Sequence, residues 1–176
     1  VMLKVTVLDG YAANPGDLDW NIFKDIAELT VYDRTPPELV VERIGDSDAI
    51  FLNKVNITKH IIEQCPKLKY IGVMATGYNV VDTKAAREAG ITVTNIPAYS
   101  TDSVAQHTFA LILNFTNQVE QHSQSVQNGD WIKSPDFCYW KSPLTELKGK
   151  TLGIFGFGSI GQKVAEIAHA FGMNVI

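Results

Sequence analysis

A glycine-rich stretch late in the sequence has the spacing of a phosphate-binding turn. Residues 156–161 read Gly-Phe-Gly-Ser-Ile-Gly, after the apolar run 151–155 and before helix-like apolar spacing that continues to Phe171. A strand, a glycine turn and a helix in this order place unpaired N–H groups and the positive end of a helix dipole at the turn. The sequence therefore predicts a site for a dinucleotide pyrophosphate. The alternative is a glycine-rich turn that binds nothing.

Each glycine of this motif has its own predicted role. Gly156 permits the tight turn, Gly158 lets a pyrophosphate approach because it has no Cβ, and Gly161 lets the helix pack closely on the strand. The acidic residue that contacts the adenosine ribose is expected about 20 residues further along, whereas only residues 162–176 follow the motif. The motif predicts NAD as the cofactor, and NADP is not excluded because the residue that selects between them is expected beyond residue 176. We also expect the chain to be truncated.

A second glycine turn, residues 74–79, follows another apolar run and reads Met-Ala-Thr-Gly-Tyr-Asn. Glycine at the carboxyl end of a parallel strand leaves N–H groups facing the region where α/β sheets bind ligands. Thr76 and Gly77 are therefore candidates to bind a carboxylate. The alternative is a plain strand-to-helix turn.

The elements that would position these turns alternate along the chain. Short apolar runs of the kind found in buried parallel strands alternate with segments that carry helix-start signals at Thr58 and Asp82, and Gly90 is placed to end the second of these helices. This pattern predicts an α/β fold with an open parallel sheet over residues 1–98. The expected strands are 3–8, 29–32, 49–52, 70–75 and 91–94.

Proline and polar residues at 95–99 predict a linker, and a long helix is expected after it. Ser103 and Gln106 have the spacing of a capping box, and the helix is expected to run to about residue 127. We interpret Leu111, Phe115 and Val119 of its apolar stripe as core or dimer seam, and 128–147 as an irregular loop. The second domain is expected over residues 99–176. The stripe consists of Val104, Thr108, Leu111, Phe115 and Val119.

Composition excludes several classes of protein. The chain has 19 acidic and 15 basic residues with no basic cluster, so we expect no nucleic-acid partner. No apolar run approaches the roughly 20 residues of a membrane span, and the first residues lack a signal-peptide pattern, so we expect no membrane partner. Two distant cysteines, Cys65 and Cys138, indicate reduced thiols and a cytoplasmic location.

Three stretches of the chain resemble the D-isomer-specific 2-hydroxyacid dehydrogenase family. They are ATGYNVVD (75–82), NIPAYSTDSVAQHTFALIL (95–113) and the segment 147–175, in the order and spacing of that family. The resemblance implies a flavodoxin-like substrate domain over 1–98, followed by the start of a Rossmann dinucleotide-binding domain. It also implies a homodimer contact through residues 101–140.

The resemblance assigns roles to particular residues. The N–H groups of Thr76 and Gly77 would hold the substrate carboxylate, and Tyr99 would border the substrate. Val104 would lie near the nicotinamide, whereas Gly158, Ser159 and Ile160 would contact the pyrophosphate. Ser159 differs from the Arg or His often present in the family, so no charged side chain is expected at the phosphate there.

The activity implied by the resemblance is reduction of a small 2-keto acid to the D-2-hydroxy acid by hydride transfer from NAD(P)H. The stretches DFCYW and DSVAQH are similar to members that act on hydroxypyruvate and D-glycerate. The catalytic Arg, Glu and His of the family lie beyond residue 176, so this chain alone is predicted to be inactive. The alternatives are a D-lactate dehydrogenase and a dinucleotide-sensing co-repressor on the same fold.

Other reactive side chains receive simpler interpretations. His107 is interpreted as a packed or capping residue and Cys138 as a core residue. Lys54, at the end of a strand, is interpreted as a solvated lysine, and the alternative is that it attracts an anionic substrate. The remaining histidines have no partners at metal-ligand spacing, so no metal site is expected.

Overall fold

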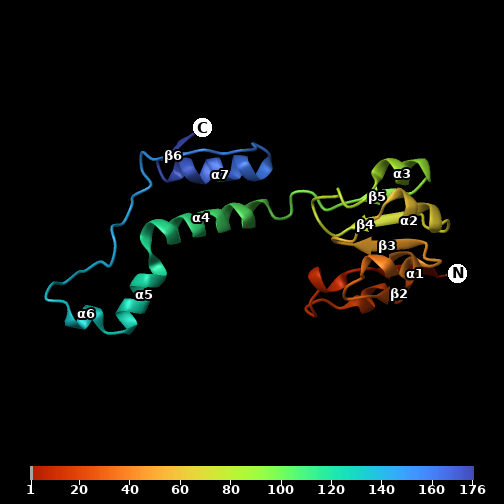
Figure 1. The fold of residues 1–176 in the computed structure, drawn as a ribbon, viewed down its shortest axis with the longest axis horizontal. Helices are drawn as coiled ribbons and strands as arrows, with labels where there is room; N and C mark the ends of the chain where they lie inside the picture. Colours follow the sequence, from red (N-terminus) through yellow and green to blue (C-terminus); the bar gives the residue numbers. More distant parts are fainter. Residues whose placement is uncertain (1) are drawn as a thin grey trace. The chain divides into compact units, whose positions relative to one another are not determined.

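The computed structural model describes residues 2–176, which form two compact units. The first unit extends to Pro97 and the second runs from Ala98 to Ile176. Each unit has its own parallel sheet and its own hydrophobic core. Figure 1 shows the helices and strands of both units. Within residues 2–176, none of the helices combines the length and the hydropathy that a bilayer crossing requires.

The first unit is a parallel five-stranded sheet in the order β2-β1-β3-β4-β5, as the alternating pattern predicts. All five expected strands are present, with ends shifted by at most two residues. Short helices connect β2 to β3, β3 to β4 and β4 to β5, whereas only 3-10 turns lie between β1 and β2. The elements are β1 (Leu3–Val7), β2 (Ala27–Val31), α1 (Val40–Ile44), β3 (Ala49–Leu52), α2 (Lys59–Gln64), β4 (Tyr70–Val73), α3 (Thr83–Glu88) and β5 (Thr92–Thr94).

The predicted helix starts of this unit are confirmed by their hydrogen bonds. The Thr58 hydroxyl accepts the N–H of Ile61 at 3.4 Å, and the Asp82 carboxylate accepts the N–H of Ala85 at 2.9 Å. Gly90 follows α3 with φ +73°, a conformation that glycine adopts without strain. These caps fix where the helices begin and end, and therefore where the strand-end turns lie.

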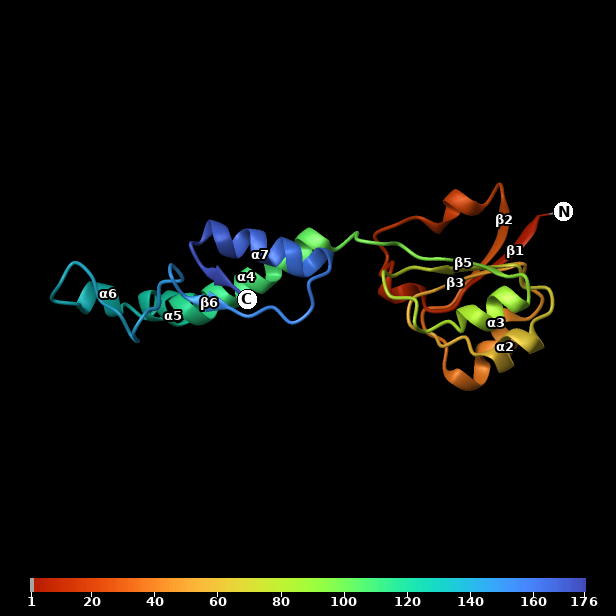
Figure 2. The ribbon, with the colours of Figure 1, turned by 90° about the horizontal axis from the view of Figure 1, so that it is seen from above.

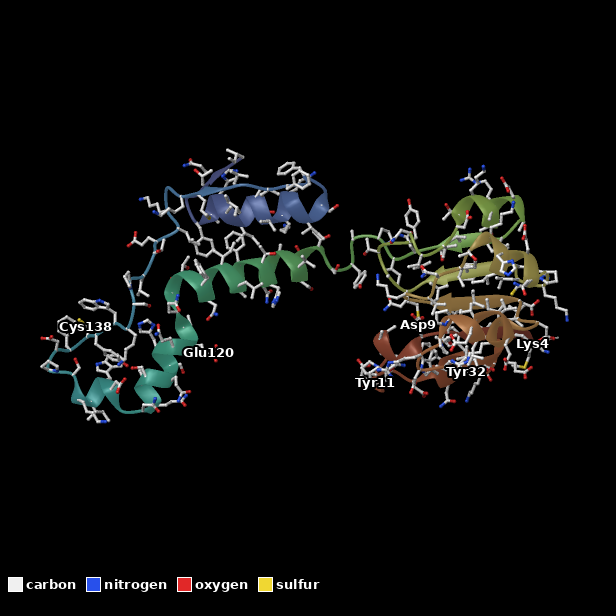
Figure 3. All side chains as sticks on the ribbon, in the orientation of Figure 1. Lys4, Asp9, Tyr11, Tyr32, Glu120 and Cys138 are labelled. Carbon is white, nitrogen blue, oxygen red and sulfur yellow. The ribbon has the colours of Figure 1, made fainter. Side chains whose placement is uncertain are left out.

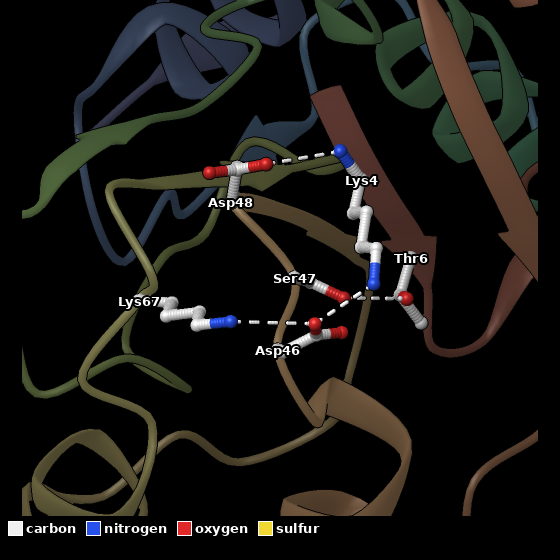
Figure 4. A network of polar contacts seen from close by, with 6 residues as sticks. All are labelled: Lys4, Thr6, Asp46, Ser47, Asp48 and Lys67. Atoms are coloured by element: carbon white, nitrogen blue, oxygen red, sulfur yellow. Dashed lines mark hydrogen bonds and ion pairs between the residues drawn. The ribbon is translucent and has the colours of Figure 1, made fainter. Parts of the chain in front are cut away.

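The amino ends of the central strands are joined by a polar network (Figure 4). The Lys4 ammonium lies 2.8 Å from an Asp46 carboxylate oxygen, and the Lys67 ammonium lies 3.4 Å from the same oxygen. The Asp48 side chain accepts the Lys4 backbone N–H at 3.0 Å. At this end of the sheet both lysines are therefore paired with a carboxylate.

The second unit packs one long helix on a βαβ segment. It contains α4 (Thr101–Asn117), α5 (Val119–Gln127), α6 (Asp130–Lys133), β6 (Thr151–Leu152), α7 (Ser159–Ala170) and β7 (Asn174–Val175). Helices α4 and α7 lie side by side in both views (Figures 1 and 2). Their contact buries Ala105 and Phe109 of α4 and stacks the ring of Phe109 on that of Phe171 with centroids 5.3 Å apart.

The structure corrects three expectations for this unit. The helix begins at Thr101 after Ser100, with no side-chain cap, so the capping box at Ser103 and Gln106 is wrong. It does not run unbroken to residue 127, because Gln118 adopts φ +50° and separates α4 from α5. The segment 128–147 is not wholly irregular, because it contains α6.

Candidate functional site

The turn after β6 has the geometry that its glycine spacing predicts. Gly156 has φ +101°, which a residue with a Cβ adopts only with strain. A Cβ on Gly161 would lie 2.3 Å from the carbonyl oxygen of Gly156, so the helix could not pack this closely on the turn with any other residue. A Cβ on Gly158 would meet no atom within 4 Å. Gly156 and Gly161 therefore serve the fold, whereas Gly158 leaves open space.

Helix α7 begins at Ser159, with Gly158 as its N-cap. The first bond of the helix runs from the Gln162 N–H to the Gly158 carbonyl at 2.9 Å. Among residues 2–176, the N–H groups of Ser159, Ile160 and Gly161 have no acceptor. Three adjacent free donors at the positive end of a helix of 12 residues can bind an anion.

Val104 lies at the same end of the second unit as this turn. The Lys163 ammonium on α7 is 3.8 Å from the Asp102 carboxylate on α4, and further along the two helices Phe109 stacks on Phe171. The helices are therefore parallel, and the start of α4 lies beside the start of α7. The side chain of Val104 is 39% exposed there. Tyr99, which precedes α4, is 65% exposed.

The turn after β4 is held in place by the segment that follows β5. The Thr76 hydroxyl donates to the Ile96 carbonyl at 3.0 Å, and the Asn95 amide donates to the Thr76 carbonyl at 2.8 Å. Within the described chain, the N–H groups of Thr76 and Gly77 have no acceptor, and both residues are exposed. The turn therefore presents two adjacent free donors at the carboxyl end of a parallel strand.

These residues are not all in one unit. Thr76 and Gly77 belong to the first unit, whereas Tyr99, Val104 and the residues of the 156–161 turn belong to the second. The role of Asn95, whose amide donates to the Thr76 carbonyl, was not predicted from the sequence. An Asn directly after an expected strand is the sequence signal that would have suggested such a role.

The structural role of Asp9 was not predicted from the sequence either. Its carboxylate accepts the backbone N–H of Asn53 at 2.7 Å and that of Lys54 at 2.6 Å, and so joins the carboxyl ends of β1 and β3. Acceptance of two short, charge-assisted hydrogen bonds by one carboxylate is a strong local restraint. The Lys54 side chain is exposed, as predicted for a solvated lysine.

The interpretations of His107 and Cys138 are wrong. Both residues are exposed, because the face of α4 that packs on α7 carries Ala105 and Phe109, and because Cys138 lies in the open segment after α6 (Figure 3). Cys65 is buried, and burial raises the pKa of its thiol, so this sulfur is a weak nucleophile. Among residues 2–176, no group of three or more His, Cys, Asp or Glu side chains is placed to hold a metal ion.

The apolar stripe of the long helix faces solvent in this unit rather than the α7 contact. Most of its members are exposed, including Phe115 at 77%. Further large apolar side chains are exposed after the break at Gln118, among them Ile132 at 91%. The exposed apolar side chains of segment 101–140 are Val104, Leu111, Phe115, Val119, Val126, Trp131, Ile132, Phe137 and Trp140.

Comparison with known proteins gives a consistent assignment. Residues 7–174 match the model of the D-isomer specific 2-hydroxyacid dehydrogenase catalytic domain. The chain is 49% identical over 177 aligned residues to a hydroxypyruvate reductase of Blautia hydrogenotrophica, covering 99% of this chain and 55% of the relative. It is 37% identical to a glycerate dehydrogenase of Methylorubrum extorquens, covering 98% of this chain and 54% of that protein.

A solved structure with the same fold is that of D-lactate dehydrogenase from Aquifex aeolicus, complexed with NAD and lactic acid. The TM-score is 0.76 at 27% sequence identity, and the match covers 98% of this chain and 50% of the other. The chain thus spans about half the length of the relatives it matches. The matched family model covers nearly all of residues 2–176, and the chain therefore belongs to the D-isomer specific 2-hydroxyacid dehydrogenase family.

Proposed function

We propose that the whole protein is an NAD(P)-dependent oxidoreductase that interconverts hydroxypyruvate and D-glycerate, or a closely similar pair of 2-keto and D-2-hydroxy acids. The observation that carries this proposal is the turn at 156–161, where open space over Gly158 adjoins three free N–H donors. The substrate pair is supported by the relatives named hydroxypyruvate reductase and glycerate dehydrogenase.

The second unit fits the pyrophosphate of a dinucleotide. Gly156 and Gly161 shape the turn, and the N–H groups of Ser159, Ile160 and Gly161 would hold the pyrophosphate over Gly158. A serine at 159 adds a hydroxyl but no charge, so the backbone provides most of the binding. Val104, exposed at the same end of this unit, would lie near the nicotinamide ring. A nicotinamide cofactor bound there supplies or accepts the hydride.

The first unit holds the substrate carboxylate. The free N–H groups of Thr76 and Gly77 donate to the two carboxylate oxygens, and the Thr76–Ile96 and Asn95–Thr76 hydrogen bonds keep those donors in place. Tyr99 borders the substrate. The proton donor, its carboxylate partner and the arginine that polarises the carbonyl come from residues outside 1–176, so residues 1–176 alone turn over no substrate.

A spectrophotometric assay tests this function. The whole protein is mixed with NADH and, separately, with hydroxypyruvate, glyoxylate and pyruvate, and NADH oxidation is followed by absorbance. Turnover is expected with all three, fastest with hydroxypyruvate, and none is expected from residues 1–176. Fastest turnover with pyruvate would favour a D-lactate dehydrogenase. Tight NADH binding without turnover by the whole protein would overturn the enzyme assignment in favour of a dinucleotide-sensing protein.

The exposed apolar side chains of residues 101–140, other than Val104, form the contact of a homodimer. Among these side chains, Phe115, Trp131, Phe137 and Trp140 are aromatic, and exposed large apolar and aromatic side chains are typical of protein–protein contacts. Light scattering after size-exclusion chromatography is expected to give a dimer for the whole protein and a monomer for the Phe115→Asp, Val119→Asp variant. Ile22→Asp, at a residue 75% exposed in the first unit, is the control and should remain a dimer. A dimer that survives the double change would contradict this interface.

The two free thiols, Cys65 and Cys138, are in keeping with a cytoplasmic location.

A further inference from the structure

A cavity of about 370 Å³ lies in the first unit at the carboxyl ends of β1, β2 and β3. Its wall contains Asp9 after β1, Arg34 and Thr35 after β2, and Lys54 after β3. In a sheet of order β2-β1-β3-β4-β5, the direction of strand succession reverses between β1 and β3, and ligands of open α/β sheets bind at such reversals. The wall contains neither Thr76 nor Gly77, so this cavity is separate from the turn after β4.

Asp9 is the one acidic residue in the wall, and its carboxylate is hydrogen-bonded to the backbone. Both Asp9 carboxylate oxygens accept N–H groups, from Asn53 at 2.7 Å and Lys54 at 2.6 Å. These bonds fix the loop after β3 and hold the Lys54 backbone at the cavity. Asp9 and Tyr11 lie at the end of the sheet opposite Lys4 (Figure 3).

The two cations of the wall have no carboxylate partner. Within residues 2–176, neither Arg34 nor Lys54 forms an ion pair, and neither side chain donates a hydrogen bond. The Arg34 guanidinium lies over the Tyr11 ring, 4.4 Å from its centroid, which orders the group while leaving its N–H donors free. The amino ends of the strands differ, because Lys4 and Lys67 both pair with Asp46 there.

The rest of the wall is mostly apolar. Val40 of α1 and Ile61 of α2 line it together with Pro37 and Val55. A wall that contains two unpaired basic residues and several apolar side chains matches a ligand with an anionic group and a short hydrocarbon body. The volume lies within the range of small-molecule sites, which begins at about 300 Å³.

We propose that this cavity binds a small organic anion, a carboxylate or phosphate ester with a short aliphatic body, through Arg34 and Lys54. The site uses neither the cofactor turn nor the turn after β4. Failure of the proposed dehydrogenase activity would therefore not disprove this site, and absence of this site would not disprove the activity.

Calorimetric titration of the whole protein with hexanoate tests the site, with hexanamide as the uncharged probe and inorganic phosphate as the anion without a body. Hexanoate is expected to bind saturably, phosphate more weakly and hexanamide not at all. Arg34→Gln and Lys54→Gln should each raise the hexanoate Kd by about fivefold or more, because each removes one charge-assisted contact. Lys69→Gln is the matched control, since its ammonium lies 3.9 Å from Asp48 near the other end of the sheet, and should leave the Kd unchanged.

Methyl NMR spectra locate the binding without reference to activity. Hexanoate is expected to shift the methyl signals of Val40, Val55 and Ile61, whether or not it also binds at the turn after β4 and shifts Thr76. Shifts confined to Thr76, hexanoate affinities equal in all three variants, or equal binding of hexanamide would overturn the proposal. Circular dichroism of each variant verifies that it is folded. None of these readouts needs NADH or turnover, so an inactive enzyme would leave the result interpretable.

Discussion

The two strand-end glycine turns differ in what their glycines do for the fold. After β6, Gly156 needs a positive φ and Gly161 needs the absence of a Cβ, because that atom would lie 2.3 Å from a carbonyl oxygen. After β4, Gly77 has no positive φ, and a Cβ there would meet nothing closer than the Asn79 side-chain oxygen at 3.4 Å. The comparison separates glycines that the backbone requires from glycines that only a ligand would require. Gly77 and Gly158 are in the second class.

The largest expected effect is at Gly161. In Gly161→Ala the new methyl overlaps the Gly156 carbonyl, and the turn must separate from the helix, at a cost of about 3 kcal/mol in the free energy of unfolding. Urea denaturation of the whole protein measures this cost. Gly153→Ala is the control, because its Cβ would meet only Ile176 at 4.0 Å, and it should change stability little. Equal stability of the two variants would contradict the close packing of α7 on the turn.

At Gly77 the expected effect is on substrate rather than on folding. Gly77→Ala places a methyl beside the two free N–H groups without strain, so the melting temperature should stay within about 1 °C. The KM for hydroxypyruvate should rise about tenfold, equivalent to about 1.4 kcal/mol, while the Kd for NADH is unchanged. An unchanged KM would mean that the turn after β4 is a plain strand-to-helix turn.

The smallest expected effect is at the amino ends of the strands, remote in sequence from both turns. The hydrogen bond from Lys4, with further help from Lys67, lowers the pKa of Asp46 below its ordinary value near 3.8. A carboxylate with a lowered folded-state pKa stabilises the fold above its unfolded pKa, and this stability is lost as pH falls through the folded value.

Asp46→Asn should therefore flatten the decline of melting temperature between about pH 5 and about pH 3, with little change in KM or in NADH affinity. The change is small because Lys4 and Asp46 are solvent-exposed. An acid transition identical to that of the unchanged protein would show that the network in Figure 4 adds nothing to stability.

Local patterns predicted the elements better than the contacts between them. Strand positions and the caps at Thr58 and Asp82 follow from the types of adjacent residues, and the structure has them. The break at Gln118 has no glycine or proline to announce it, and the helix pattern continues through it. The exposure of His107 depends on which face of α4 meets α7, a tertiary contact that helical spacing leaves open.

In the candidate site, too, the features encoded by adjacent residues were predictable, whereas the contacts between distant residues were not. The turn at 156–161 could be recognised because its glycines, its strand and its helix are contiguous in sequence. The role of Asp9 could not be recognised, because the backbone N–H groups that it accepts belong to Asn53 and Lys54, which lie 44 and 45 residues further along the chain. No local sequence pattern encodes that pairing. The unpaired state of Arg34 likewise depends on where every carboxylate of the unit lies.

The central claim is that a dinucleotide pyrophosphate rests on the open backbone over Gly158. Fluorescence titration of NADH into the whole protein and into Gly158→Ala tests it most directly, because this methyl meets no protein atom. The account predicts an unchanged melting temperature and an NADH Kd raised by about tenfold or more. An alanine variant that binds NADH as tightly as the unchanged protein would contradict it.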